Sequence, residues 1–102
     1  MTDRKFNIFG TTYKLKFMDS INPDDKETFT WGDTDGRIHT IRIATKDING
    51  KDINEDEVDI TILHELYHAI LNEGQYRSCS EDEPLVEWLA RCTHSLKKQK
   101  VL

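Results

Sequence analysis

The sequence has little cysteine, no long apolar run and no recognisable targeting segment. Its two cysteines, Cys79 and Cys92, are too few for the disulfide framework that stabilises small secreted domains. The longest apolar stretches are only a few residues long, so no membrane-spanning helix is expected. Residues 1–6 lack the apolar core of a signal peptide. These features favour an intracellular, cytoplasmic protein that has no membrane partner.

Basic charge is also scarce. The 102 residues include 14 Lys or Arg and 19 Asp or Glu, which gives a net charge of −5. Dedicated nucleic-acid binders are usually basic, so no nucleic-acid partner is expected. Lys97, Lys98 and Lys100 form a basic cluster, which the dipole of a helix ending there explains. The length predicts a single domain over residues 1–102.

The N-terminal half carries the patterns of β-strands. Residues 5–18 predict a β-hairpin that turns at Gly10, because apolar side chains alternate with lysines in its second half. A further short strand is expected at residues 28–31, followed by an acidic turn at residues 32–36. Residues 37–43 are dense in β-branched side chains and predict the strongest strand of the chain.

The C-terminal half predicts two helices. Asn54 and Glu57 are close to a capping box, and a helix is expected over residues 55–73 with an apolar stripe at helical spacing. A second helix is expected to begin near Ser80, where Ser80 and Glu83 repeat the capping signature. Since strands come first and helices follow, the predicted class is α+β, with a small antiparallel sheet followed by two packed helices.

Two histidines and a glutamate in the middle of the first helix carry the strongest chemical signal. His64 and His68 are four residues apart, so both imidazoles lie on one helix face and can bind one zinc ion. Glu65 is offset by one residue, where it can take a proton from a zinc-held water and deliver it to a leaving amine. The alternative is a helix with surface His and Glu side chains and no metal.

A catalytic zinc site needs three protein ligands if water is to hold the fourth position. Glu87 is the predicted third ligand, because a second helix folded back on the first can bring it over the His64–His68 face. The alternative is an exposed Glu87 that pairs with Arg91 one turn later. Carboxylates in the first turn of this helix are also explained by the helix dipole. Rival ligands are Glu81, Glu83 and His94.

Residues around the motif supply further candidates for the site. Residues 38–43 are expected to form an edge strand beside the metal, which pairs with the backbone of an extended substrate. His39 and Arg42 then face either the cleft or the solvent, and the sequence leaves both open. Tyr67 and Tyr76 are candidate hydrogen-bond donors near the site, although core packing is favoured for Tyr67.

Several segments resemble one known family of enzymes. Residues 61–71, with the sequence TILHELYHAIL, resemble the zinc helix of the ImmA/IrrE-type metallopeptidases, which are common on phages and other mobile elements. Residues 86–90 are similar to the later family helix, in which a glutamate completes the zinc site. The segment at residues 31–36, followed by the strand at residues 38–43, resembles short phage members, which carry a Gly-acidic turn before the active-site strand. The resemblance covers about residues 5–98.

The resemblance implies a minimal zincin-like domain with zinc at His64, His68 and Glu87 and with Glu65 as the general base. Well-studied members act on helix-turn-helix repressors, so a repressor is one candidate among protein or peptide substrates. Larger members select substrates with an appended domain, and no such domain is expected within these 102 residues. Two functions are therefore expected: a phage-encoded zinc metallopeptidase, or a non-catalytic zinc-bound module that binds a protein. The peptidase is favoured, because Glu65 has no purpose in a purely structural site.

Overall fold

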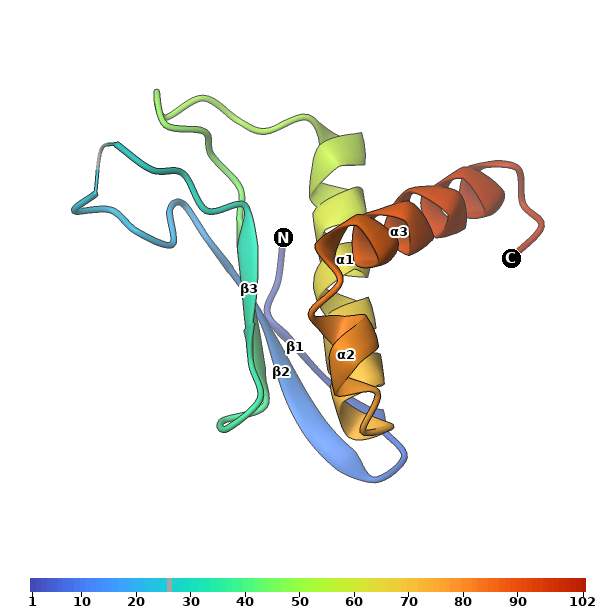
Figure 1. Cartoon of the computed structure of the whole chain (residues 1–102). Coiled ribbons are helices and arrows are strands. Elements are labelled where there is room, and N and C mark those ends of the chain that lie inside the picture. Colours follow the sequence, from blue (N-terminus) through green and yellow to red (C-terminus); the bar gives the residue numbers. More distant parts are fainter. Residues whose placement is uncertain (26) are drawn as a thin grey trace.

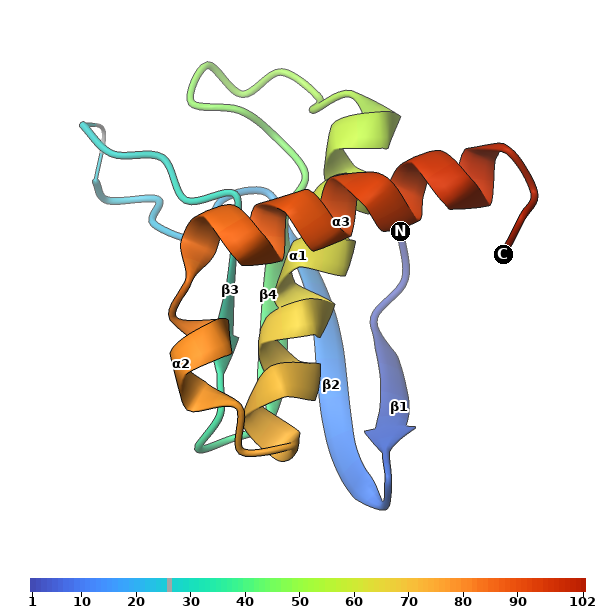
Figure 2. The same cartoon turned by 45° about the vertical axis from the view of Figure 1, so that its right-hand side comes forward.

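A computed structural model describes residues 1–25 and 27–102. Within these residues, four strands form one sheet and three helices follow it along the chain, which confirms the predicted α+β class. Helix α1 (Glu55–Glu73) packs between the sheet and the last helix, α3 (Glu83–Lys98), which crosses it (Figure 1, Figure 2). None of the helices in the described residues is long and apolar enough to span a membrane.

The sheet has the strand order β1-β2-β4-β3. The β1–β2 and β3–β4 pairs are antiparallel, whereas β2 and β4 run parallel, so the sheet is mixed rather than wholly antiparallel. The β1–β2 hairpin confirms the prediction for residues 5–18, including the turn at Gly10, whose φ of +93° favours glycine. The strands are β1 (Arg4–Ile8), β2 (Thr11–Met18), β3 (Gly32–Asp35) and β4 (Thr40–Ala44).

Strand β3 occupies residues that the sequence assigned to a turn. The strand predicted at residues 28–31 does not form, and the turn lies at residues 36–39 instead. Gly-Asp-Thr-Asp has little intrinsic β propensity, so β3 owes its conformation to pairing with β4. This pairing also makes β4 an internal strand, and the predicted edge strand at residues 38–43 is therefore wrong. The edge next to α1 is β3.

One face of the sheet packs on α1 and forms the hydrophobic core. Alternate side chains of β2 and β4 point towards this face, as the period of two requires. Ile41 and Ile43 are fully buried, which fits an internal strand. The buried core residues are Tyr13, Leu15, Ile41, Ile43, Val58 and Ala69.

Helix α1 begins and ends where its cap residues predict. The side chain of Asn54 accepts a hydrogen bond from the backbone N–H of Asp56, and Gly74 is the C-cap. The start of α3 differs from the prediction: Asp82, not Ser80, is its N-cap and accepts a hydrogen bond from the backbone N–H of Leu85. Ser80 instead ends a short helix, α2 (Arg77–Ser80), that the sequence did not predict.

Candidate metal centre

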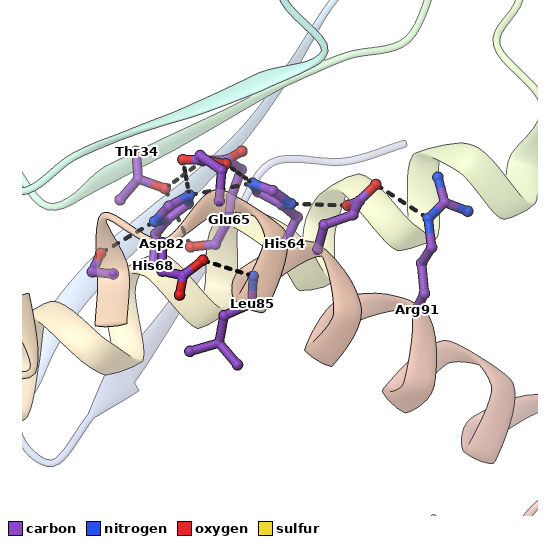
Figure 3. A network of polar contacts seen from close by, with 10 residues as sticks. Thr34, His64, Glu65, His68, Asp82, Leu85 and Arg91 are labelled. Atoms are coloured by element: carbon purple, nitrogen blue, oxygen red, sulfur yellow. Dashed lines mark hydrogen bonds and ion pairs between the residues drawn. The ribbon is translucent and has the colours of Figure 1, made fainter. Parts of the chain in front are cut away.

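The two histidines of the motif lie one turn apart on α1 and face the start of α3 (Figure 3). Their ring centroids are 4.9 Å apart, and the Nε2 atoms of His64 and His68 approach to 3.2 Å. Their side chains are only 18% and 14% exposed. Two imidazole nitrogens that converge in this way are the first two donors of a possible metal site, as the spacing predicted.

Glu83, in the first turn of α3, supplies a carboxylate to both histidines. Its Oε2 lies 2.9 Å from Nε2 of His64, and its Oε1 lies 3.0 Å from Nε2 of His68. One ligand atom from each of the three side chains can be chosen so that all lie within 4.8 Å of one another. Two imidazoles and one carboxylate are a donor set that suits zinc, so the residues present fit the ion that the motif implies.

The remaining nitrogen of each imidazole also has a polar partner. Nδ1 of His64 lies 3.0 Å from Oε1 of Glu87, and Nδ1 of His68 lies 3.1 Å from Oγ of Ser80. Histidines that bind metals usually donate their other N–H to such a group, which holds the ring in place. The two Nε2 atoms therefore face each other and Glu83, whereas the two Nδ1 atoms point away from this centre and contact Glu87 and Ser80.

Glu87 joins the cluster, but on the outer side of His64. Its other oxygen, Oε2, accepts a hydrogen bond from Nε of Arg91 at 3.1 Å, which is the i+4 pairing considered from the sequence. Glu87 as a zinc ligand stays a prediction. Glu83, which the sequence offered only as a rival, lies next to both histidines because α3 begins at Asp82. An Asp two residues before Pro84 is a helix-start signal that could have indicated this.

Glu65 is buried beneath the edge strand beside this cluster. Its side chain points towards β3, where Oε1 accepts a hydrogen bond from Oγ1 of Thr34 at 2.8 Å (Figure 3). Burial raises the pKa of Glu65 above its ordinary value, against the hydrogen bond from Thr34 and the nearby imidazoles, which lower it. A buried carboxylate with a raised pKa next to candidate metal ligands is suited to accepting a proton.

A glycine lets the edge strand come this close to α1. A Cβ atom at Gly32 would lie 2.9 Å from Cγ2 of Thr61 and 3.1 Å from Cγ of Glu65. The absence of a side chain at this position therefore brings Thr34, two residues later, over Glu65. The sequence reasoning missed both Gly32 and Thr34, because it placed them in a turn.

A cleft of about 920 Å³ runs between β3 and the helices and contains the cluster. His64, Glu65 and Glu83 are among its lining residues, and so are Phe29 and Trp31, on the segment that precedes β3. An extended molecule that lies along β3 would pass the candidate metal ligands and Glu65. The arrangement combines candidate metal ligands, a buried carboxylate that can accept a proton and an open strand edge, which are the parts that hydrolysis of such a molecule requires.

Three other predicted candidates lie outside this cleft. His94 points to α1, where its Nε2 is 3.2 Å from Oδ1 of Asp56, so it is not placed as a rival ligand. His39 lies in the turn before β4 and packs against the ring of Tyr13. Arg42 forms a two-pronged ion pair with Asp33 on the neighbouring strand.

The two tyrosines do not line the cleft either. The hydroxyl groups of Tyr67 and Thr93 form a hydrogen bond that joins α1 to α3, which agrees with the packing role favoured for Tyr67. Tyr76 is the exposed N-cap residue of α2 and does not line the cleft. Neither is placed to donate a hydrogen bond at the candidate centre.

The fold and the site together define a class: an α+β domain with a candidate metal centre on its central helix. No known family model, curated protein or solved structure matches this chain.

Proposed function

We propose that this protein is a zinc-dependent metallopeptidase of the HExxH type, with a zincin-like fold. The observation that carries the proposal is the meeting of His64, His68 and Glu83 beside the buried Glu65. A zinc ion held there would polarise a scissile carbonyl and make its water ligand more acidic. The resemblance of residues 61–71 to the ImmA/IrrE zinc helix supports the same class, a phage origin and a cytoplasmic place of action.

His64 and His68 hold the zinc in this proposal, and α3 supplies the third ligand. We assign that ligand to Glu83, because its carboxylate lies next to both Nε2 atoms. Glu87 then keeps the ring of His64 in place through Nδ1. Glu87 as the ligand, with Glu83 in the supporting position, is the alternative assignment within the same function.

Glu65 is the general base of the proposed reaction. It takes a proton from the attacking water and delivers it to the leaving amine as the peptide bond breaks. The Thr34 hydroxyl holds one of its oxygens, and burial under β3 keeps bulk water away from the carboxylate. These contacts orient Glu65 while leaving its second oxygen available for the proton.

The open edge of β3 favours an extended peptide as the substrate. The backbone N–H of Ala44 donates to the carbonyl of Trp31 at 2.9 Å, so Trp31 belongs to a hydrogen-bonded pair with β4. Because such pairs alternate along an antiparallel ladder, the backbone groups of Gly32 and Thr34 point to the open side. A substrate strand can add there. A repressor protein is a candidate substrate, as the family resemblance implies.

Substitution of Glu65 by Gln tests this function. We expect the Glu65→Gln variant to keep its fold and its zinc while its rate falls about a hundredfold to ten-thousandfold, because the amide cannot accept the proton. The measurement is a proteome-derived peptide cleavage screen, with zinc content determined on both proteins. Cleavage at the wild-type rate by Glu65→Gln would overturn the mechanism, and a zinc-bound protein without any cleavage would favour the non-catalytic binding module.

A further inference from the structure

Phe29 and Trp31 form an aromatic pair on the segment that leads into β3. Their rings meet edge to face, with centroids 5.0 Å apart and an angle of 78° between the planes. Trp31 is 48% exposed and neither residue belongs to the buried core, while both are among the residues that line the cleft. Such a pair beside a polar centre has the character of a binding wall.

Residues from two helices line the cleft as well. Ile60 of α1 and Pro84 of α3 line the same cleft as the aromatic pair. The charged residues on the α3 side pair with one another: Arg91 lies 3.1 Å from Glu87 and 3.8 Å from Glu57. The charged side chains on the α3 side are therefore already paired, and the aromatic pair Phe29 and Trp31 can receive an apolar group of a ligand.

Beyond His68, the surface has the opposite character. A second hollow shares His68, Asn72 and Glu83 with the cleft, and its other lining residues are mostly polar or charged. These include Arg37, Gln75, Arg77 and Glu81. A molecule lying along β3 thus meets an apolar environment on one side of the histidines and a polar environment on the other.

The direction of β3 decides which part of a peptide meets the apolar end. The strand runs from Gly32, next to Trp31, towards Asp35. A peptide that adds antiparallel to this edge, the more stable of the two pairings, runs the other way. Its C-terminal half then lies at the end where Phe29 and Trp31 are.

We propose that Phe29 and Trp31 form a specificity subsite for a large apolar side chain on the C-terminal side of the scissile bond. This inference rests on the proposed peptidase function, which it deepens by naming the preferred substrate class. In this proposal the exposed ring of Trp31 contacts the incoming side chain, and Phe29, packed edge to face with Trp31, supports it.

Binding can be tested without hydrolysis in the zinc-loaded Glu65→Gln variant. The probes are end-blocked Ala/Ser octapeptides in which one Phe, or one Asp, is placed at each position in turn. With Trp88→Phe added, Trp31 is the sole tryptophan and reports binding by its fluorescence. We expect the best Phe peptide to bind at least about tenfold more tightly than the best Asp peptide. Equal affinities, or no measurable binding by any peptide, would overturn the subsite.

Calorimetric titration of Trp31→Ala, also with Glu65→Gln, then tests the residue itself. We expect the preference for Phe to disappear while zinc content and circular dichroism stay unchanged. Trp88→Ala is the matched control, because Trp88 is an exposed tryptophan of α3 that does not line the cleft. A Phe preference that survives in Trp31→Ala, or that is lost equally in Trp88→Ala, contradicts the proposal.

Cleavage of the Phe peptides by the wild-type enzyme separates this inference from the proposed function. We expect Phe in the product that carries the new N-terminus. Cleavage with Phe only in the other product, or with no preference, overturns the subsite and leaves the peptidase function intact. A Trp31-dependent binding preference without any cleavage supports the apolar subsite and contradicts the peptidase function.

Discussion

Glu83 and Glu87 lie one turn apart on α3 and contact different nitrogens of the same imidazole. Glu83 is next to Nε2 of His64, the atom that faces His68, whereas Glu87 is next to Nδ1 on the other side of the ring. A metal can be shared by the two histidines only on the Nε2 side. The nitrogen that each glutamate contacts, and not its distance to His64, therefore distinguishes a candidate metal ligand from a residue that orients the imidazole.

Conservative substitution of these two glutamates separates their roles. We expect Glu83→Gln to lower zinc affinity more than Glu87→Gln, because Glu83 is the ligand in the proposed site and its loss would remove a bond to the ion. Loss of a supporting contact typically costs about tenfold to a hundredfold in affinity. Competition with a chromophoric chelator measures both variants. The opposite order would identify Glu87 as the ligand, as the sequence alone predicts.

At the scale of the element, strand β3 is the part of the site with the weakest local signal. Its sequence is Gly-Asp-Thr-Asp, and its position is set by the ladder to β4, by the Asp33–Arg42 ion pair and by its close approach to α1. The first two interactions join β3 to the neighbouring strand β4, and the third joins it to a helix that is distant in sequence. None of them is encoded within the four residues of β3. Strand β3 nevertheless positions Thr34 over Glu65 and offers the open edge.

Gly32→Ala tests whether this close approach matters. The new Cβ would meet Cγ2 of Thr61 at 2.9 Å and the backbone oxygen of Arg42 at 3.1 Å, so the strand must shift. We expect the free energy of unfolding to fall by about 1–3 kcal/mol, with loss of the Thr34–Glu65 hydrogen bond and of activity. Urea unfolding measures the change.

The matched control is Gly36→Ala, in the turn after β3. A Cβ there meets nothing within 4 Å, and Gly36 does not have a positive φ. We expect its stability to stay within about 0.5 kcal/mol of the wild type. If Gly32→Ala is equally harmless, the close packing of β3 on α1 does not hold the site together.

The contrast between α1 and β3 shows what the sequence could predict. Helix α1 was predicted to its end residues, because Asn54, Gly74 and the apolar period act within the helix itself. The same local rule placed His64, Glu65 and His68 together. Strand β3 has little β propensity of its own and depends on pairing with β4 and on its contact with the distant helix α1, and the parallel β2–β4 pairing joins strands that are not consecutive.

The third candidate ligand, a carboxylate of α3, falls between these cases. Its identity depends on where α3 begins, and a shift of that start from Ser80 to Asp82 accompanies the formation of helix α2. With this start, the first turn of α3 lies over the histidines and Glu83 reaches them both. The local cap signal was present, but the competing Ser80 signature resembled it.

At the scale of the whole molecule, the candidate centre joins elements that are separate in sequence. The two histidines come from α1, Ser80 from α2 and Glu83 from α3, and Glu65 in their midst is tied to the sheet through Thr34. A metal ion bound here would link α3 to the central helix. Metal binding should therefore be linked to the stability of the fold.

Removal of zinc tests this linkage. Zinc at about a hundred times its dissociation constant adds about 2.7 kcal/mol to the free energy of unfolding. For a domain of this size, that corresponds to a rise in melting temperature of roughly 10–20 °C over the chelator-treated protein. Differential scanning calorimetry with and without chelator measures it. The His64→Ala/His68→Ala double variant should show no response, and full zinc occupancy in that variant would rule out the site.

A second joint between the layers lies at the C-terminal end of α1. There, Oε1 of Glu73 accepts a hydrogen bond from the Tyr13 hydroxyl at 2.6 Å, and Oε2 accepts one from Oγ1 of Thr11 at 3.0 Å. These two bonds, that of Tyr13 first, lower the pKa of Glu73 below its ordinary value. Helix and sheet are thus joined through a group whose charge depends on pH.

The sign of this pH dependence follows from the direction of the shift. Because the pKa of Glu73 is lower in the folded than in the unfolded protein, ionised Glu73 stabilises the fold above its unfolded pKa of about 4.3. That contribution is lost as pH falls through the lower, folded pKa.

We therefore expect Glu73→Gln to be less stable than the wild type at pH 7, with the difference shrinking below about pH 4. Tyr13→Phe removes the donor that lowers the pKa of Glu73 most, so its free energy of unfolding should change less with acid pH than that of the wild type. Urea unfolding from pH 7 to pH 3 measures all three proteins, and a constant difference between wild type and Glu73→Gln over this range would show that Glu73 does not couple ionisation to folding.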